Sequence, residues 1–173
     1  MKKTMVITLL LLCMITLFAA TTTQTITLVS VVKEAVPCFT MEVVNVRNGN
    51  SNFNSNEATI RSCDIKKDVS TKLNIVQTLS RFTGSIELNI SFTELTYNGF
   101  STNGARVSGF VKENHGRSGY TTASSNSIDL VINYNGIPID NSVAAEVFIE
   151  YNGNSTLPKG EYVSFIRMSY AVK

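Results

Sequence analysis

The C-terminal segment Leu157–Lys173 reads LPKGEYVSFIRMSYAVK and gives the clearest indication of the fold class. Pro158 and Gly160 predict a turn, because proline fixes φ and glycine adopts positive φ at little cost. After the turn, every second residue falls on one face: Tyr162, Ser164, Ile166, Met168, Tyr170 and Val172. This alternation predicts a core β-strand that runs up to Lys173, the last residue of the sequence.

Upstream of this strand, the chain consists of short β-type segments separated by turn residues. The predicted strands are residues 21–32, 41–46, 57–64, 72–79, 86–92, 95–100, 105–111, 128–134 and 143–151. Asn-Gly pairs at 98–99, 103–104, 135–136 and 152–153 are typical of hairpin turns. Two polar segments, 48–56 and 112–126, are predicted loops. No segment shows helical periodicity, so the pattern predicts one all-β domain, a sandwich or a barrel.

The N-terminal residues 1–20 read as a secretory signal peptide, with Lys2 and Lys3 before an apolar run that ends in Ala19-Ala20. Cleavage is expected after Ala20, to within one or two residues. The run is too short, and has the wrong flanks, for a good transmembrane helix. A lipoprotein would need a small residue before Cys13, where this chain has leucine.

Without the signal peptide, the surface is electrically balanced. The sequence has 15 basic and 13 acidic residues, and the predicted cleavage removes two of the basic ones and none of the acidic ones. A net charge of zero gives no electrostatic argument for binding nucleic acid or an anionic membrane. A mature chain of about 153 residues is one domain's worth of sequence.

Two cysteines remain after processing, Cys38 and Cys63. In an exported protein the expected state of such a pair is a disulfide. The alternative is two unrelated thiols.

The residues that carry enzyme chemistry are sparse. His115 is the single histidine, whereas a zinc site needs several His or Cys ligands. No Gly-x-Ser-x-Gly motif is present, and the four aspartates lack the spacing of a calcium loop. The sequence therefore predicts no cofactor, no metal and no catalytic site, and a loop histidine at His115.

Several of these features together resemble the chaperone–usher fimbrial subunits, or pilins, of Gram-negative bacteria. The Pro158-x-Gly160-x-Tyr162 turn followed by a terminal strand is similar to the C-terminal end of pilins. A β-branched arm at 21–32, with a cysteine soon after it, is similar to their N-terminal end. The Dr adhesins and the aggregative adherence fimbria subunits look closest. Residues 64–126 match no part of that pattern.

The resemblance implies an incomplete immunoglobulin-like β-sandwich that is completed by donor-strand exchange. The domains would be a signal peptide (1–20), a donor arm (21–32) and a pilin domain (33–173). The donor residues would be Thr25, Ile26 and Leu28. The acceptor groove would contain Tyr162, Ile166, Met168 and Tyr170. A periplasmic chaperone would anchor the C-terminal carboxylate, on Lys173. The other partners would be neighbouring subunits, an outer-membrane usher and a host receptor.

The sequence therefore predicts a structural and adhesive subunit of a surface fimbria, exported through the periplasm to the bacterial cell surface. The alternative is a monomeric secreted β-sandwich binding module with a loop-borne ligand site. A third hypothesis is a small secreted hydrolase on the same scaffold, which would depend on His115.

Overall fold

The computed structural model describes residues 36–78, 81–112, 119–123, 126–136 and 141–173. The chain divides into two units, Met1–Val32 and Lys33–Lys173, and all described residues belong to the second. The predicted signal peptide and donor arm, with Thr25, Ile26 and Leu28, lie outside the described residues.

The described residues form β-strands and no helix, which confirms the all-β prediction. The strands are β1 (Phe39–Arg47), β2 (Asn50–Phe53), β3 (Glu57–Ser62), β4 (Val69–Gln77), β5 (Thr83–Phe92), β6 (Thr96–Tyr97), β7 (Phe100–Ser101), β8 (Ala105–Val111), β9 (Gly119–Ala123), β10 (Ser127–Asn135), β11 (Ser142–Tyr151) and β12 (Tyr162–Val172).

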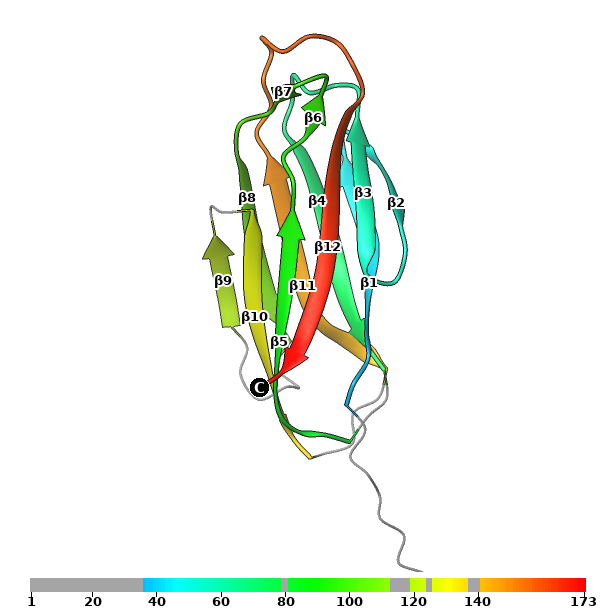
Figure 1. The fold of residues 1–173 in the computed structure, drawn as a ribbon, viewed down its shortest axis with the longest axis vertical. Coiled ribbons are helices and arrows are strands. Elements are labelled where there is room, and N and C mark those ends of the chain that lie inside the picture. The colour runs from blue at the N-terminus through cyan, green and yellow to red at the C-terminus, as the bar shows by residue number, and fades with distance from the viewer. Residues whose placement is uncertain (1–35, 79–80, 113–118, 124–125, 137–140) are drawn as a thin grey trace, which may run out of the picture. The chain divides into compact units, whose positions relative to one another are not determined.

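These strands form two sheets that lie face to face, as Figure 1 shows. The first sheet has the order β1-β4-β11-β8-β9, and the second has the order β10-β5-β12-β3-β2. The short strand β6 pairs with β12, and β7 pairs with β6. The ladders of both main sheets are antiparallel. The predicted sandwich is therefore confirmed.

The core lies between the two sheets and is built from alternate residues of each strand. β4 alternates between buried and half-buried positions along its whole length, and β10 alternates between buried and exposed ones from Ile128 onwards. Leu73, Ile86, Leu88, Ile90, Ile132, Val147 and Ile149 are fully buried. Burying apolar side chains at period two on both sheets is what holds a sandwich together.

The central strands of both sheets follow the immunoglobulin arrangement. In that fold, strands A, B, E and D form one sheet, and strands C, F and G form the other. Here β1, β4, β11 and β8 take the A-B-E-D positions, while β5 and β12 take the C and F positions. The hairpin β2–β3 is inserted after the first strand, and β3 lies beside β12 on the side where strand G is expected.

Two predicted loops contain strands instead. Segment 48–56 holds β2, and segment 112–126 holds β9. An Asn-rich segment has low β-propensity, but pairing with β3 gives β2 the backbone hydrogen bonds of an edge strand. Its turn is fixed by the Asn54 side chain, whose Oδ1 accepts hydrogen bonds from the Asn56 and Glu57 amides.

The turn before β12 explains the Pro-x-Gly-x-Tyr pattern. The Tyr162 hydroxyl donates a hydrogen bond back to the Pro158 carbonyl at 3.0 Å, which resembles the tyrosine corner of immunoglobulin-like sandwiches. The Tyr97 ring packs 5.5 Å from the Tyr162 ring, between centroids. A Cβ at Gly160 would overlap the Tyr97 ring, so this position accommodates only glycine without a shift.

Candidate functional site at the open half of the last strand

The two neighbours of β12 are staggered along it. β3 pairs with Tyr162–Arg167, and β5 pairs with Ile166–Val172 on the other side. Within the described ranges, no strand continues β3 beside Met168–Val172. The first half of β12 is therefore inside the sheet, while its second half forms an edge.

Backbone groups at this edge lack partners. The Lys173 amide donates to the Ser85 carbonyl at 2.8 Å. In this half of β12, the backbone N–H and C=O groups of odd-numbered residues therefore point toward β5, and those of even-numbered residues point toward the open side. The Met168 amide donates to the Asn56 carbonyl at 2.8 Å. No described residue pairs with the outward amides and carbonyls of Tyr170 and Val172. Such a row of free backbone groups is a template for pairing with another strand.

The opposite wall is β1, the outer strand of the other sheet. The Cys38 carbonyl points toward β4 and accepts a hydrogen bond from the Thr78 amide, just after that strand. The backbone N–H and C=O groups of Phe39 and Met41 therefore point away from β4, toward the open side of β1. The Met41 amide reaches the Ser55 carbonyl at 2.7 Å. The turn of the β2–β3 hairpin thus contacts both β1 and β12 and closes the space between the sheets on that side.

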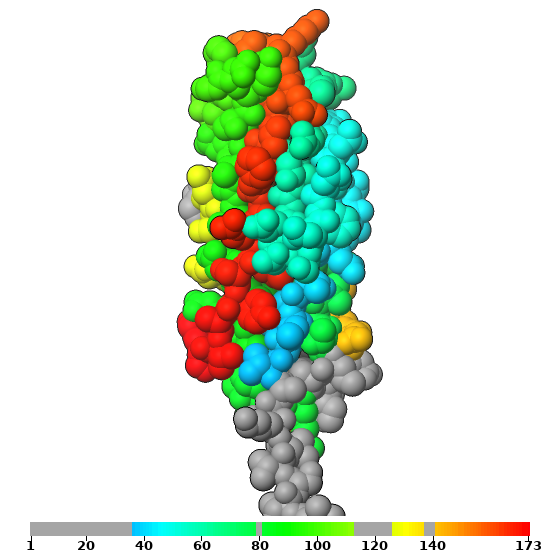
Figure 2. Space-filling model, turned by 45° about the vertical axis from the view of Figure 1, so that its right-hand side comes forward, coloured from blue at the N-terminus to red at the C-terminus, as the bar shows by residue number. Residues whose placement is uncertain are grey.

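Beyond this turn, the two sheet edges approach each other through aromatic rings. Phe39 and Tyr170 meet edge to face, with centroids 5.0 Å apart. Figure 2 shows the start of β1 in blue beside the end of β12 in red, below the hairpin. We call this region the edge gap and define it by Phe39, Met168, Tyr170 and Val172. Two of its residues are apolar and exposed: Tyr170 is 41% exposed and Val172 is 52% exposed.

The edge gap contains only part of the predicted acceptor groove. Tyr162, Ile166 and Met168 are at most 3% exposed and belong to the core. Tyr170 alone among the predicted residues is both at the gap and accessible. Burial raises the pKa of the Tyr170 hydroxyl, and the neighbouring Cys38 thiol raises that pKa further. The predicted anchor Lys173 places its ammonium 3.0 Å from the Glu87 carboxylate.

The predicted disulfide is wrong in this structure, because Cys38 and Cys63 are free, exposed thiols. β12 shows how far apart they lie. Cys38 precedes Phe39, which contacts Tyr170, whereas Cys63 follows Ser62, which pairs with Tyr162. At 3.3 Å per residue, Tyr170 and Tyr162 are about 26 Å apart along β12, and the two cysteines beside them are separated by a similar distance. A disulfide needs Cα atoms within about 7 Å.

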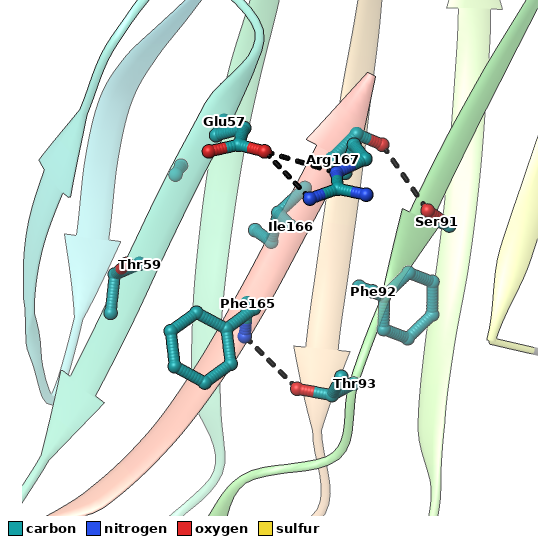
Figure 3. Close-up of a pocket in the computed structure, with 9 residues that line it drawn as sticks. Glu57, Thr59, Ser91, Phe92, Thr93, Phe165, Ile166 and Arg167 are labelled. Carbon is teal, nitrogen blue, oxygen red and sulfur yellow. Dashed lines mark hydrogen bonds and ion pairs between the residues drawn. The ribbon is translucent and has the colours of Figure 1, made fainter. Parts of the chain in front are cut away.

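A second surface lies on the outer face of the β3–β12–β5 sheet, where β5 leaves the sheet after Phe92. It is a shallow depression of about 430 Å³. Figure 3 shows Phe165 and Arg167 along it, with the guanidinium bound to the Glu57 carboxylate at 2.8 and 3.0 Å. Phe165 is 60% exposed, and its amide donates to the Thr93 hydroxyl at 2.9 Å. The alternation placed Phe165 on the outer face, but the sequence did not reveal the depression.

The described residues carry little else that could act chemically. They contain no group of three or more His, Cys, Asp or Glu side chains that could hold a metal ion. They also contain no helix long and apolar enough to span a membrane. His115 lies outside the described residues.

Comparisons with known proteins find distant structural likenesses. No protein-family model matches the sequence, and no curated protein is significantly similar to it. The carbohydrate-binding module TmCBM61, solved with β-1,4-galactotriose, is 9% identical with a TM-score of 0.36, over 78% of this chain and 88% of that one. The N-terminal cellulose-binding domain of Cellulomonas fimi β-1,4-glucanase C is 8% identical with the same TM-score and coverage.

A third solved structure is the glycoside hydrolase domain of Endo-D from Streptococcus pneumoniae R6. It is 13% identical with a TM-score of 0.36, over 76% of this chain and 21% of that one. Likenesses at these identities and TM-scores carry no statement about the ligand or activity of this chain.

Proposed function

We propose that this chain is a structural subunit of a bacterial surface fimbria, which accepts a β-strand from a neighbouring copy at the edge gap. The observation that carries the proposal is the half-open last strand. β12 takes the F position of the sandwich, and the adjacent G position is filled by β3 only as far as Arg167. A strand added beside Met168–Val172 would complete the sheet.

The predicted arm has the composition that such a strand needs. Residues 21–32 are mostly β-branched, and Ile26 and Leu28 fall on one face at period two. Pairing with the free groups of Tyr170 and Val172 would add roughly four backbone hydrogen bonds at about 1 kcal/mol each. Covering exposed apolar surface at Tyr170 and Val172 would add about 25 cal/mol per Å².

The arm of one copy and the gap of the next are different surfaces. Contact between them is heterologous, so repetition builds a filament rather than a closed dimer. We further propose that the chain is exported through the periplasm and that a chaperone strand covers the edge gap before an usher assembles the subunits. The support for these partners is the exposed β12 edge, which would otherwise favour uncontrolled pairing.

Arm deletion tests the proposal. The mature chain from residue 21 should form oligomers that survive SDS at room temperature and dissociate on heating. The same chain starting at residue 33 should be monomeric and should gain several degrees of melting temperature on binding a peptide of residues 21–32. A matched peptide with Ile26→Asp and Leu28→Asp should give no gain. A monomeric mature chain, together with no stabilisation by the unmodified peptide, would rule the proposal out.

The second candidate is a monomeric secreted binding module. The observation that favours it is the depression beside Phe165, where an exposed ring lies next to an Arg–Glu pair that offers both donors and acceptors. This site lies on a sheet face rather than on the predicted loops. A glycan array should then show binding that is abolished by Phe165→Ala and retained by Phe53→Ala, which removes a ring of similar exposure on β2. If the array shows no bound glycan, a carbohydrate-binding function at this depression is ruled out.

A further inference from the structure

The two free thiols lie at opposite ends of the sandwich. We call the end where β1 begins and β12 ends the foot, and the end where β3 ends and β12 begins the tip. Cys38 is at the foot, where Phe39 contacts Tyr170, and Cys63 is at the tip, after the Ser62–Tyr162 pair. Both are exposed, and their separation of about 26 Å prevents a bond within one chain.

Each thiol has apolar neighbours. At the tip, Cys63 lines a recess of about 700 Å³ together with Ile65, Leu157 and Pro158. The charged side chains of the recess balance, with Lys66 and Lys159 against Asp64 and Glu161. At the foot, Val36 precedes Cys38 by two residues and is 45% exposed. The tip therefore offers an apolar recess beside a thiol, and the foot offers an exposed apolar side chain beside a thiol.

We propose that Cys38 of one copy and Cys63 of the next form an interchain disulfide, with Val36 of the first copy seated in the tip recess of the second. The proposal rests on the head-to-tail strand exchange proposed above. A foot-to-tip contact is heterologous, so it repeats along a filament in the same sense as the strand exchange. The occupant of the recess is thus the foot of a second copy of this chain.

Chain length is compatible with both contacts at once. If Val32 of the donor arm lies beside Met168 of the next copy, the six residues from there to Cys38 span at most about 20 Å. β3 begins one residue beyond the Met168 level, opposite Arg167, and reaches the tip in six residues, which is also about 20 Å. A donor strand antiparallel to β12 therefore brings Cys38 close to Cys63 of the next copy.

The bond requires an oxidant, and the chemistry is thiol–disulfide exchange. A thiolate of Cys38 attacks the disulfide of a dithiol oxidase, forms a mixed disulfide and releases one oxidase thiolate. The Cys63 thiolate of the neighbouring copy then attacks the Cys38 sulfur and releases the second oxidase thiolate. Two protein thiols lose two electrons, the oxidase disulfide gains them, and the protons of the two thiols end on the oxidase dithiol.

The experiment uses the full chain exported to a bacterial periplasm and run on non-reducing gels after heating in SDS, which dissociates strand-exchanged copies. We expect a ladder that collapses to monomer with dithiothreitol. Cys38→Ser and Cys63→Ser should each run as monomer, with unchanged melting temperatures. Mixed before oxidation, the two variants should form a dimer and no larger species, because each supplies one half of the bond.

Digestion of the ladder bands with trypsin should yield residues 34–47 joined to residues 62–66. Val36→Asp should lower the ladder yield several-fold at limiting oxidant, whereas Val44→Asp, an exposed valine on β1, should leave it unchanged. Dimers formed by either single variant alone would overturn the proposal, because they would show like-with-like bonding. Heat-labile oligomers with two free thiols would also overturn it, while leaving the strand exchange intact.

Discussion

The two halves of β12 have the same alternating sequence and different surroundings. From Tyr162 to Arg167, the strand has β3 on one side, and its inward residues Tyr162, Ser164 and Ile166 are at most 1% exposed. From Met168 onwards, exposure of the same face rises from 3% to 41% at Tyr170 and 52% at Val172. The difference shows that alternation determines which face a side chain occupies, while a neighbouring strand determines whether that face is covered.

The largest difference between the two halves of β12 should appear when one inward side chain is truncated in each half. Ile166→Ala should lower the free energy of unfolding by about 3 kcal/mol, because it leaves a cavity in a filled core. Tyr170→Ala should lower it by about 1 kcal/mol, because the side chain is partly solvated and loses mainly its contact with Phe39. Urea denaturation measures both values. Equal losses would mean that the second half is as well covered as the first.

A smaller loss of stability is expected when the hydroxyl group of Tyr162, at the start of β12, is removed. Tyr162→Phe removes the hydrogen bond to the Pro158 carbonyl and should cost about 1 kcal/mol. The matched variant Tyr170→Phe should cost less than half as much, since its ring is partly exposed. Thermal unfolding monitored by circular dichroism gives both. A larger loss for Tyr170→Phe would contradict the placement of the open half.

The smallest effect concerns the ion pair at the junction of the two halves. Arg167→Gln breaks the contact with Glu57, where the β3 ladder ends, and should cost about 0.5 kcal/mol because both side chains are largely exposed. The control Arg106→Gln removes an exposed arginine from β8 and should be neutral. The difference between the two variants should shrink in high salt. If salt leaves the difference in unfolding free energy between the two variants unchanged, packing rather than charge stabilises this junction.

Much of the architecture was readable from local patterns. The strands around Ile86–Phe92 and Ile128–Tyr134 were predicted because a half-buried sheet imposes period two on side chains. The Asn98-Gly99 hairpin was predicted because both residues adopt positive φ, at 47° and 83°. β2 was missed because its residues are poor strand formers and are paired only through β3.

The candidate site was less readable. The pattern grouped Tyr162 with Tyr170, although one is buried and the other lies at the gap. The cysteine prediction failed for a related reason. Export of the protein suggested a disulfide, but β1, β2 and β3 carry the chain between the two cysteines to the opposite end of the sandwich.

Local sequence patterns were sufficient to predict the all-β class, the positions of the main strands and the inward face of the terminal strand, because each of these depends on a few neighbouring residues. Only the folded chain shows that the β3–β12 ladder ends at Arg167, that the β12 edge beyond it is open and that the two thiols are far apart. Those features depend on pairings between segments distant in the chain, and no local pattern records where such a pairing ends.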